Sequence, residues 1–340
     1  MEMELEEIPE CCGSGCTNCV LDEKCKISAV DIEDKPSIFD TNCYHPFRCD
    51  SIAQCSPNTF RFRFKFHCLQ NSGTDDKLLV IPAGTHLMIR APIGWPNDRR
   101  ILNSLFQKWR KHASASDNVA PRVPLKRLEK HDQTEENLYF SRPYTPIKAN
   151  REEKWFDVLV KLEPHGEMSE FLQTLDVGAL TEWKGVYGSF SWSRNRRKNL
   201  IGFAQGVGLA PIYSIMTSIL EDEVDETRLH LIYCCKDVEN ILLRNELLRM
   251  ATYWNFKCEI YLSGESCECG GKSSISQCLS SRKKYNETIF NHRLTKLDIE
   301  NLLLKITQNS SQVLVCGTEA FTSLIETCIT DLNTKDFYKF

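Results

Sequence analysis

Four short motifs between residues 142 and 317 combine residue types that bind phosphate-bearing cofactors. They are residues 142–146 (Arg-Pro-Tyr-Thr-Pro), 166–169 (Gly-Glu-Met-Ser), 206–211 (Gly-Val-Gly-Leu-Ala-Pro) and 316–317 (Cys-Gly). An arginine offers two parallel charge-assisted hydrogen bonds to phosphate oxygens, and glycines let a backbone come close to a ligand. A helix that starts after a glycine-rich turn adds unpaired N–H groups, which attract anions. The motifs therefore predict that the chain binds dinucleotides.

In this order the motifs resemble the ferredoxin-NADP reductase superfamily, and most closely its NADH-cytochrome b5 reductases. The resemblance covers roughly residues 55–93 and 138–340. It implies an enzyme with two cofactors, FAD and NADH, in which the flavin accepts a hydride and releases electrons singly. The acceptor expected from the resemblance is cytochrome b5 or a similar haem protein.

The first motif matches the flavin side of that family. By the resemblance, Arg142 binds the FAD pyrophosphate, Tyr144 packs on the isoalloxazine ring and Thr145 hydrogen-bonds the cofactor. Pro143 and Leu159 are expected to contact FAD as well. Taken alone, the segment equally fits a proline-fixed extended strand with a surface arginine and a packing tyrosine.

The second motif stands where the family has Gly-Lys-Met-Ser at a helix start. By the resemblance its four residues bind the flavin pyrophosphate: Gly166, Glu167, Met168 and Ser169. Glu167 replaces the lysine, and a carboxylate facing a phosphate is unfavourable. We therefore expect the Glu167 side chain to turn outward, and flavin affinity to be weaker or to depend more on Arg142. An ordinary capped helix explains the same residues without a ligand.

The third motif follows an apolar segment, residues 200–204, and precedes a predicted helix at 211–220, which is the context of a nucleotide-binding turn. By the resemblance its NADH-binding residues are Gly206, Val207, Gly208 and Pro211. The family pattern is Gly-Gly-Thr-Gly-Ile-x-Pro, so Gln205 and Val207 are departures, and Val207 lacks a hydroxyl that contacts the cofactors in relatives. The alternative is a plain strand-turn-helix of an unrelated α/β protein.

The fourth motif ends an apolar segment, residues 313–317, and is followed by Thr-Glu-Ala-Phe at 318–321 where the family has Pro-Pro-Pro-Met. By the resemblance Cys316 and Gly317 lie against the nicotinamide ring. The residues expected to act in electron transfer are Cys316, Tyr144 and Lys161, with Lys161 stabilising the anionic reduced flavin. Without the resemblance, Cys316 is simply a buried thiol.

The pattern along the chain predicts two domains. Residues 59–68 alternate apolar and polar side chains, which places Phe60, Phe62, Phe64 and Phe66 on one face of a strand. Further short strands, expected at 78–81, 86–90, 155–162 and 181–184, favour an antiparallel β-barrel, the FAD domain, over residues 41–195. Alternating strands and helices over residues 196–340 predict a Rossmann-like parallel α/β domain that binds NADH. Residues 94–137 are interpreted as an insertion, with an amphipathic helix possible only at 101–109.

Composition excludes several classes of protein. The chain has 340 residues, 26% of them charged, and a net charge of -4, which argues against general nucleic-acid binding. No apolar run reaches the roughly 20 residues that span a bilayer, so we expect no transmembrane segment and at most peripheral membrane contact. Seventeen cysteines without a secretory signal favour thiols in a reducing compartment, and we expect the cytoplasm.

The first 40 residues form a separate cysteine-rich segment. Its thiols at Cys11, Cys12, Cys16 and Cys19 could bind a metal, and unliganded thiols fit equally well.

Nicotinamide preference is expected to be for NADH, because no Ser-Arg pair for a 2′-phosphate follows Cys235, although Asn240 stands where NADH enzymes often have Asp. Two alternatives stay open. One is a regulatory module that keeps the fold without redox activity, and the other is an NAD(P)H flavin reductase with another acceptor.

Overall fold

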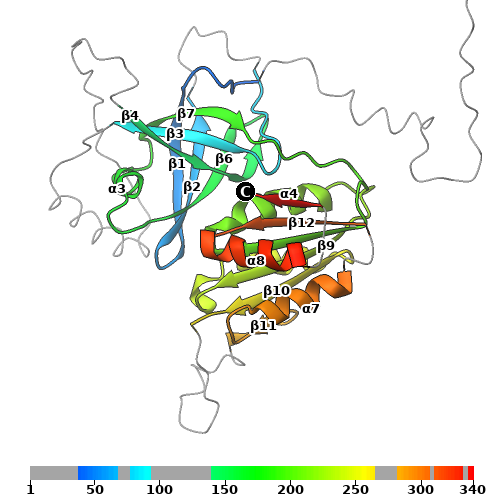
Figure 1. Cartoon of the computed structure of the whole chain (residues 1–340). Helices are drawn as coiled ribbons and strands as arrows, with labels where there is room; N and C mark the ends of the chain where they lie inside the picture. The colour runs from blue at the N-terminus through cyan, green and yellow to red at the C-terminus, as the bar shows by residue number, and fades with distance from the viewer. Residues whose placement is uncertain (1–36, 68–76, 93–138, 265–281, 307–309, 332–335) are drawn as a thin grey trace, which may run out of the picture.

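The computed structural model describes residues 37–67, 77–92, 139–264, 282–306, 310–331 and 336–340 (Figure 1). They form two sheets, one antiparallel and one parallel, which confirms the expected fold class. The predicted insertion and its possible helix at 101–109 lie outside the described residues, as does the cysteine-rich start. Within the described residues, no helix combines the length and apolar character needed to cross a membrane.

The first domain is a curled seven-stranded antiparallel sheet with strand order β4-β3-β7-β1-β2-β6-β5 (Figure 1). The strands are β1 (His45–Ser56), β2 (Thr59–Phe66), β3 (His86–Pro92), β4 (Tyr139–Tyr144), β5 (Pro146–Asn150), β6 (Trp155–Lys161) and β7 (Leu180–Tyr187). One short helix, α3 (Glu167–Gln173), connects β6 to β7. The second domain boundary of the sequence analysis, at 195/196, falls between β7 and the first strand of the second domain.

Aromatic side chains fill the core of this sheet, as the alternating pattern of β2 predicts. Phe62 and Phe64 are 2% and 0% exposed, while Phe60 and Phe66 pack against the same core from its margin. The ring centroids of Phe64 and Trp183 are 4.8 Å apart.

The opposite face of β2 is polar. Arg63 donates two hydrogen bonds to the Asp157 carboxylate on β6, at 2.7 and 3.0 Å, and its guanidinium lies 3.6 Å from the centroid of the Trp155 ring. This ion pair ties β2 to β6 on the side away from the core.

The strand expected at 78–81 is wrong. Leu78 forms only an isolated bridge with Ser37. The backbone bonds of this segment go to neighbouring loops, because Ile38 donates to the Leu78 carbonyl at 2.9 Å and Leu79 donates to the Arg151 carbonyl at 3.2 Å. Leu79 is nevertheless 2% exposed, so its apolar side chain serves the core without a strand.

The second domain is a six-stranded parallel sheet with strand order β11-β10-β9-β8-β12-β13. Its strands are β8 (Asn199–Gln205), β9 (Arg228–Cys235), β10 (Phe256–Leu262), β11 (Thr288–Phe290), β12 (Ser311–Cys316) and β13 (Phe337–Lys339). Its helices are α4 (Leu209–Leu220), α5 (Arg244–Met250), α7 (Lys296–Ile306) and α8 (Glu319–Asp331), with 3-10 turns η2 (Gly206–Gly208) and η3 (Val238–Asn240).

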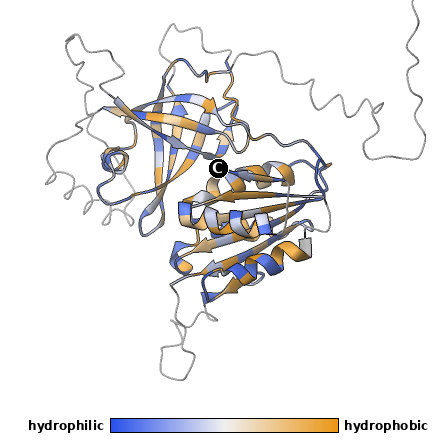
Figure 2. Ribbon diagram, in the orientation of Figure 1, coloured by the Kyte–Doolittle hydropathy of each residue, from blue (hydrophilic) through white to orange (hydrophobic). Residues whose placement is uncertain are grey.

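The inner strands β8, β9, β10 and β12 are mostly buried on both faces, which explains their largely apolar sequence (Figure 2). Successive residues of β8 point to opposite sides. Leu200 and Ala204 join the core formed with α4 and α5, whereas Ile201 and Phe203 join the core formed with α7 and α8. The first of these cores also contains Ile147 and Leu159 from the antiparallel domain, so the two domains share apolar packing.

The aromatic core yields a stability prediction. We expect Phe64→Ala to lower the free energy of unfolding by about 3–5 kcal/mol, because it leaves a cavity beside Trp183. Phe66→Ala, at the margin of the same core, should cost less, about 1–3 kcal/mol. Denaturant unfolding followed by tryptophan fluorescence measures both. Equal losses for the two variants would contradict the core position of Phe64.

Candidate functional site

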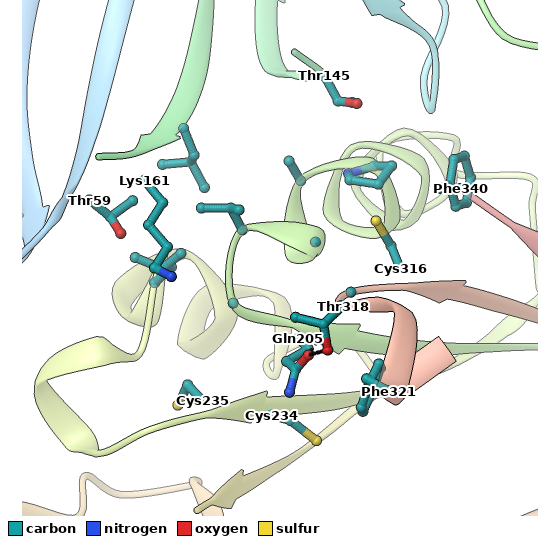
Figure 3. A pocket seen from close by; sticks show the side chains of 18 of the residues that line it. Thr59, Thr145, Lys161, Gln205, Cys234, Cys235, Cys316, Thr318, Phe321 and Phe340 are labelled. Carbon is teal, nitrogen blue, oxygen red and sulfur yellow. Dashed lines mark hydrogen bonds between the residues drawn. The ribbon is translucent and has the colours of Figure 1, made fainter. Parts of the chain in front are cut away.

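A cavity of about 1040 Å³ lies where the two domains meet (Figure 3). On one side it is bounded by the carboxyl ends of β8, β9 and β12, and on the other by β4, β6 and the β1–β2 connection. Ligands of open parallel α/β sheets bind at the carboxyl ends of the strands. The position and size of the cavity therefore suit cofactors that contact both domains.

Most of the residues predicted from the motifs line this cavity. They are Pro143, Tyr144, Thr145, Leu159, Lys161, Gly206, Val207, Gly208, Pro211, Cys316 and Gly317. The antiparallel domain supplies the first five and the parallel domain the last six. Residues up to 174 positions apart in the sequence, from Pro143 to Gly317, thus border one space.

The wall from the antiparallel domain combines the apolar surface of Tyr144 and Leu159 with polar groups and the cation of Lys161. Tyr144, at the end of β4, has its ring 6.2 Å from that of Trp183, and burial raises the pKa of its phenol to about 12. The phenol is therefore neutral at physiological pH. Lys161, at the end of β6, forms an ion pair with Glu163, which also lines the cavity. The Glu163 carboxylate therefore partly neutralises the positive charge of Lys161.

The remaining predicted flavin-side residues lie outside the cavity, around the start of α3. Arg142 and Glu167 are exposed, and the guanidinium NH2 of Arg142 is 4.0 Å from a Glu167 carboxylate oxygen. Met168 is buried in the aromatic core, and the Ser169 hydroxyl accepts a hydrogen bond from the Glu163 backbone N–H at 3.0 Å. Gly166 precedes the helix without a side-chain cap. Glu167 is thus exposed, as expected, but its carboxylate faces Arg142.

The glycine-rich turn brings backbone into the cavity. Gly206 has φ +55°, a left-handed conformation, and no atom lies within 4 Å of the place where a Cβ would stand. At Gly208 a Cβ would stand 2.5 Å from the Cys316 carbonyl oxygen, so only glycine lets α4 begin this close to β12. The first turn of α4 has no side-chain cap and no acidic residue. The Leu209 N–H donates to the Gly206 carbonyl, so the N–H groups offered to an anion are those of the preceding turn, Gly206–Gly208.

Cys316 ends β12 beside Ala204 of β8. Burial raises the pKa of its thiol to about 11, so the sulfur is protonated and uncharged at physiological pH. A neutral thiol packs against a planar ring but is a poor nucleophile. The site therefore offers shape and hydrogen bonding at this point rather than acid–base chemistry.

Several lining residues escaped the motif analysis. His86 follows no motif, and burial lowers the pKa of its imidazole. Lys236 directly follows β9, which was a usable signal, whereas nothing local marks Arg293. The aromatic chain end, residues 337–340, was by contrast visible in the sequence: Tyr338 and Phe340 line the cavity and pack on Phe190, with ring centroids 5.1 and 5.7 Å away. Their clustering depends on the edge strand β13, whose pairing the sequence does not indicate.

The charges around the cavity favour phosphate groups. Its cationic lining residues are Lys161, Lys236, Arg293 and Lys339, and its acidic lining residue is Glu163. Near the end of β9, the Asp237 carboxylate accepts hydrogen bonds from the backbone and side-chain nitrogens of Asn240, at 3.1 and 2.7 Å. The Asp237 carboxylate is therefore engaged by Asn240, and Asp237 does not line the cavity.

Comparisons with known proteins agree with this geometry. A family profile for an oxidoreductase FAD-binding domain matches residues 130–192, and one for an oxidoreductase NAD-binding domain matches residues 203–327. A human protein named NADH-cytochrome b5 reductase-like is 26% identical over 95% of this chain and 89% of its own length. Its mouse counterpart is 29% identical over 77% and 73%, and NADH-cytochrome b5 reductase 2 of Neosartorya fischeri is 35% identical over 58% and 46%.

Solved structures show the same fold. The cytochrome b5 reductase domain of Ulva prolifera nitrate reductase superposes with a TM-score of 0.57 and 20% identity, covering 89% of this chain and all of that domain. The CS-b5R domains of human Ncb5or give a TM-score of 0.61 and 18% identity over 88% of this chain and 70% of theirs. With sequence identities of 20% and 18%, these two comparisons show a shared fold.

The packing at Gly208 can be tested by substitution. We expect Gly208→Ala to destabilise the protein by about 1–3 kcal/mol, because the added Cβ must displace the Cys316–Gly317 backbone. Gly206→Asn is the matched control: its site is open and asparagine tolerates a left-handed conformation, so its cost should be below about 1 kcal/mol. Denaturant unfolding measures both. A neutral Gly208→Ala would show that α4 and β12 do not depend on this approach.

Proposed function

We propose that this chain, which belongs to the cytochrome b5 reductase-like oxidoreductases of the ferredoxin-NADP reductase family, passes electrons from NADH through FAD to a one-electron acceptor. Cytochrome b5 is our candidate acceptor, because the relatives carry its name. The observation that supports the proposal most is the single cavity lined by residues of both matched regions, Tyr144 and Lys161 on one side and Gly208 and Cys316 on the other.

We assign the antiparallel side of the cavity to FAD. When bound, FAD supplies the chemistry that the chain lacks, since it accepts two electrons together and releases them one at a time. Tyr144 and Leu159 offer apolar surface to its ring system, and Thr145 offers a hydroxyl. Lys161 brings a positive charge near that ring, and Arg142 is placed to hold phosphate outside the cavity once its contact with Glu167 is broken.

We assign the parallel side to NADH. The N–H groups of the turn before α4 suit the pyrophosphate, and Lys236 and Arg293 add positive charge toward the ends of β9 and β11. Cys316 holds its neutral thiol where a nicotinamide ring would pack. Because Cys316 and Tyr144 are both protonated at physiological pH, neither exchanges a proton there, and the contribution of the chain is to orient two rings and exclude water.

A basic cluster, Arg194, Arg196, Arg197 and Lys198, precedes β8 and is a candidate surface for an acidic acceptor. The basic cluster before β8 is partly paired within the chain, since Arg194 donates to Asp222 at 2.7 Å and Arg197 donates to Asp336 at 2.6 Å. These contacts reduce the charge available to an acidic partner. We propose a cytoplasmic location, because the cysteines in the described ranges are all free thiols. The metal predicted at Cys11–Cys19 stays a prediction outside those ranges.

The first test is a visible spectrum of the purified protein followed by anaerobic NADH. We expect a bound flavin that is bleached within seconds, and reoxidation by cytochrome b5 faster than by free flavin. A protein that stays colourless with FAD supplied would favour the regulatory module instead. Bleaching by NADPH as readily as by NADH, with free flavin as the better acceptor, would favour the flavin reductase.

The contact between Arg142 and Glu167 yields a second prediction. We expect Glu167→Lys to tighten FAD binding by about threefold to tenfold, because it frees Arg142 and adds a positive charge near phosphate. Glu167→Gln should give a smaller gain. Fluorescence titration of the FAD-free protein measures the dissociation constants.

Glu152→Lys, in the exposed turn after β5, is the matched control for this titration because it makes the same change of charge at another exposed site. It should leave FAD affinity unchanged. If Glu167→Lys binds FAD no better than Glu152→Lys, the Glu167 carboxylate does not oppose the cofactor.

A further inference from the structure

Gln205 and Thr318 are joined by two hydrogen bonds across the carboxyl ends of two neighbouring strands. The backbone N–H and the hydroxyl of Thr318 both donate to the Gln205 side-chain oxygen Oε1, at 3.1 and 2.7 Å (Figure 3). Gln205 ends β8, and Thr318 stands between β12 and α8. Both residues line the cavity, and both replace the residue type of the resembled family, so the two departures from its pattern contact each other.

These bonds determine which way the Gln205 amide faces. A backbone N–H can only donate, so the atom that accepts from Thr318 must be the amide oxygen and not the nitrogen. The amide nitrogen Nε2 therefore points away from Thr318. In Figure 3 it points toward the side of Cys234, the residue of β9 that pairs with Gln205. No hydrogen-bond partner for Nε2 is found within the described part of the chain.

The surroundings of Nε2 suit an anion. Gln205 directly precedes the turn Gly206–Gly208, whose backbone lines the cavity and leads into α4, a helix start with no side-chain cap and no acidic residue. It stands between Cys316 on β12 and Cys234 on β9, the strands on either side of β8. A dinucleotide that reaches from the end of β12 to the end of β9 passes this point with its bridging phosphates, its only anionic part.

We propose that Gln205 is a positioning residue for the dinucleotide, and that its Nε2, oriented by Thr318, donates a hydrogen bond to a phosphate oxygen of the NADH pyrophosphate. The inference rests on the proposed function only in taking the parallel side of the cavity as the dinucleotide site. Thr318 acts through Gln205, because its two donors fix the amide and leave Nε2 toward the ligand.

A purely structural role would use the same two bonds differently. Gln205 also packs against Gly317, where an added Cβ would stand 2.9 Å from the Gln205 Cβ, and its oxygen caps the first N–H before α8. If bracing this loop were its only task, a side chain that keeps an acceptor for Thr318 would bind dinucleotide as well as glutamine does. Gln205→Glu separates the roles, because one carboxylate oxygen still accepts from Thr318 while the other replaces the donor.

The experiment is calorimetric titration of the FAD-loaded protein with NAD⁺ and with ADP-ribose, which has both phosphates but no nicotinamide. We expect Gln205→Glu to weaken both ligands on the order of tenfold to hundredfold, since it exchanges a donor to a charged group for a repelling charge. Thr318→Val removes only the hydroxyl donor and should weaken both ligands about twofold to fivefold. Thermal unfolding and retained FAD absorbance check that each variant is folded.

Asn301→Asp is the matched control, because it adds the same charge on an exposed residue of α7 that does not line the cavity. It should leave both affinities unchanged. Loss of NAD⁺ binding with ADP-ribose binding intact would overturn the assignment to phosphate, and unchanged binding of both ligands would leave only the bracing role. If Gln205→Glu does not fold, equal binding by Thr318→Val and the unmodified protein overturns the proposal.

The unmodified protein separates this inference from the proposed function. If it binds ADP-ribose but its flavin is not reduced by NADH, the proposed function fails and the role of Gln205 is still decided by the variants. If it binds neither ADP-ribose nor NAD⁺, the positioning role fails as well.

Discussion

The approach of Gly208 to the Cys316–Gly317 backbone is the constraint on which the cavity depends. Because Gly208 has no Cβ, α4 can begin in contact with the end of β12. The ends of β8 and β12 can therefore remain paired in the sheet. The start of α4 and the partly buried thiol of Cys316 consequently border the same cavity. Ile147 and Leu159 pack into the same apolar core as α4, so the antiparallel domain is held against the opening. A close backbone contact in one domain therefore sets the shape of a site shared by two.

Burial determines the chemical character of this site. It raises the pKa of both Cys316 and Tyr144, so that these two groups beside the expected rings are uncharged. Among the cations, Lys161 is expected beside the flavin ring and pairs with Glu163, whereas Lys236 and Arg293 follow β9 and β11, where they would meet phosphate or ribose. Such a division suits a reaction in which a hydride and electrons move between bound rings, since that reaction needs orientation and exclusion of water more than a proton donor.

Local features were predictable from the sequence, and long-range contacts were not. The alternation that buries Phe62 and Phe64 and the strand-turn-helix at Gly206–Gly208 follow from periodicity and glycine placement over a few residues. The strand expected at 78–81 failed because its apolar residues reach the core from a loop. Arg293 and the partner of Gln205 depend on which strands become neighbours, a fact that no local pattern in the sequence contains.

The departures from the resembled family differ in physical character, and this bears on whether the site has decayed. A site released from its function would collect polar groups without partners, because nothing would select their pairing. Gln205 is instead matched by Thr318, a residue 113 positions away that donates to it twice. Val207 is partly buried against the apolar core, so its branched side chain also has a structural place. Glu167 is the departure that we expect to oppose FAD, and it lies in an exposed position where its contact with Arg142 is weak. The site is therefore better described as altered than as degraded, which favours an active reductase over a module that only keeps the fold.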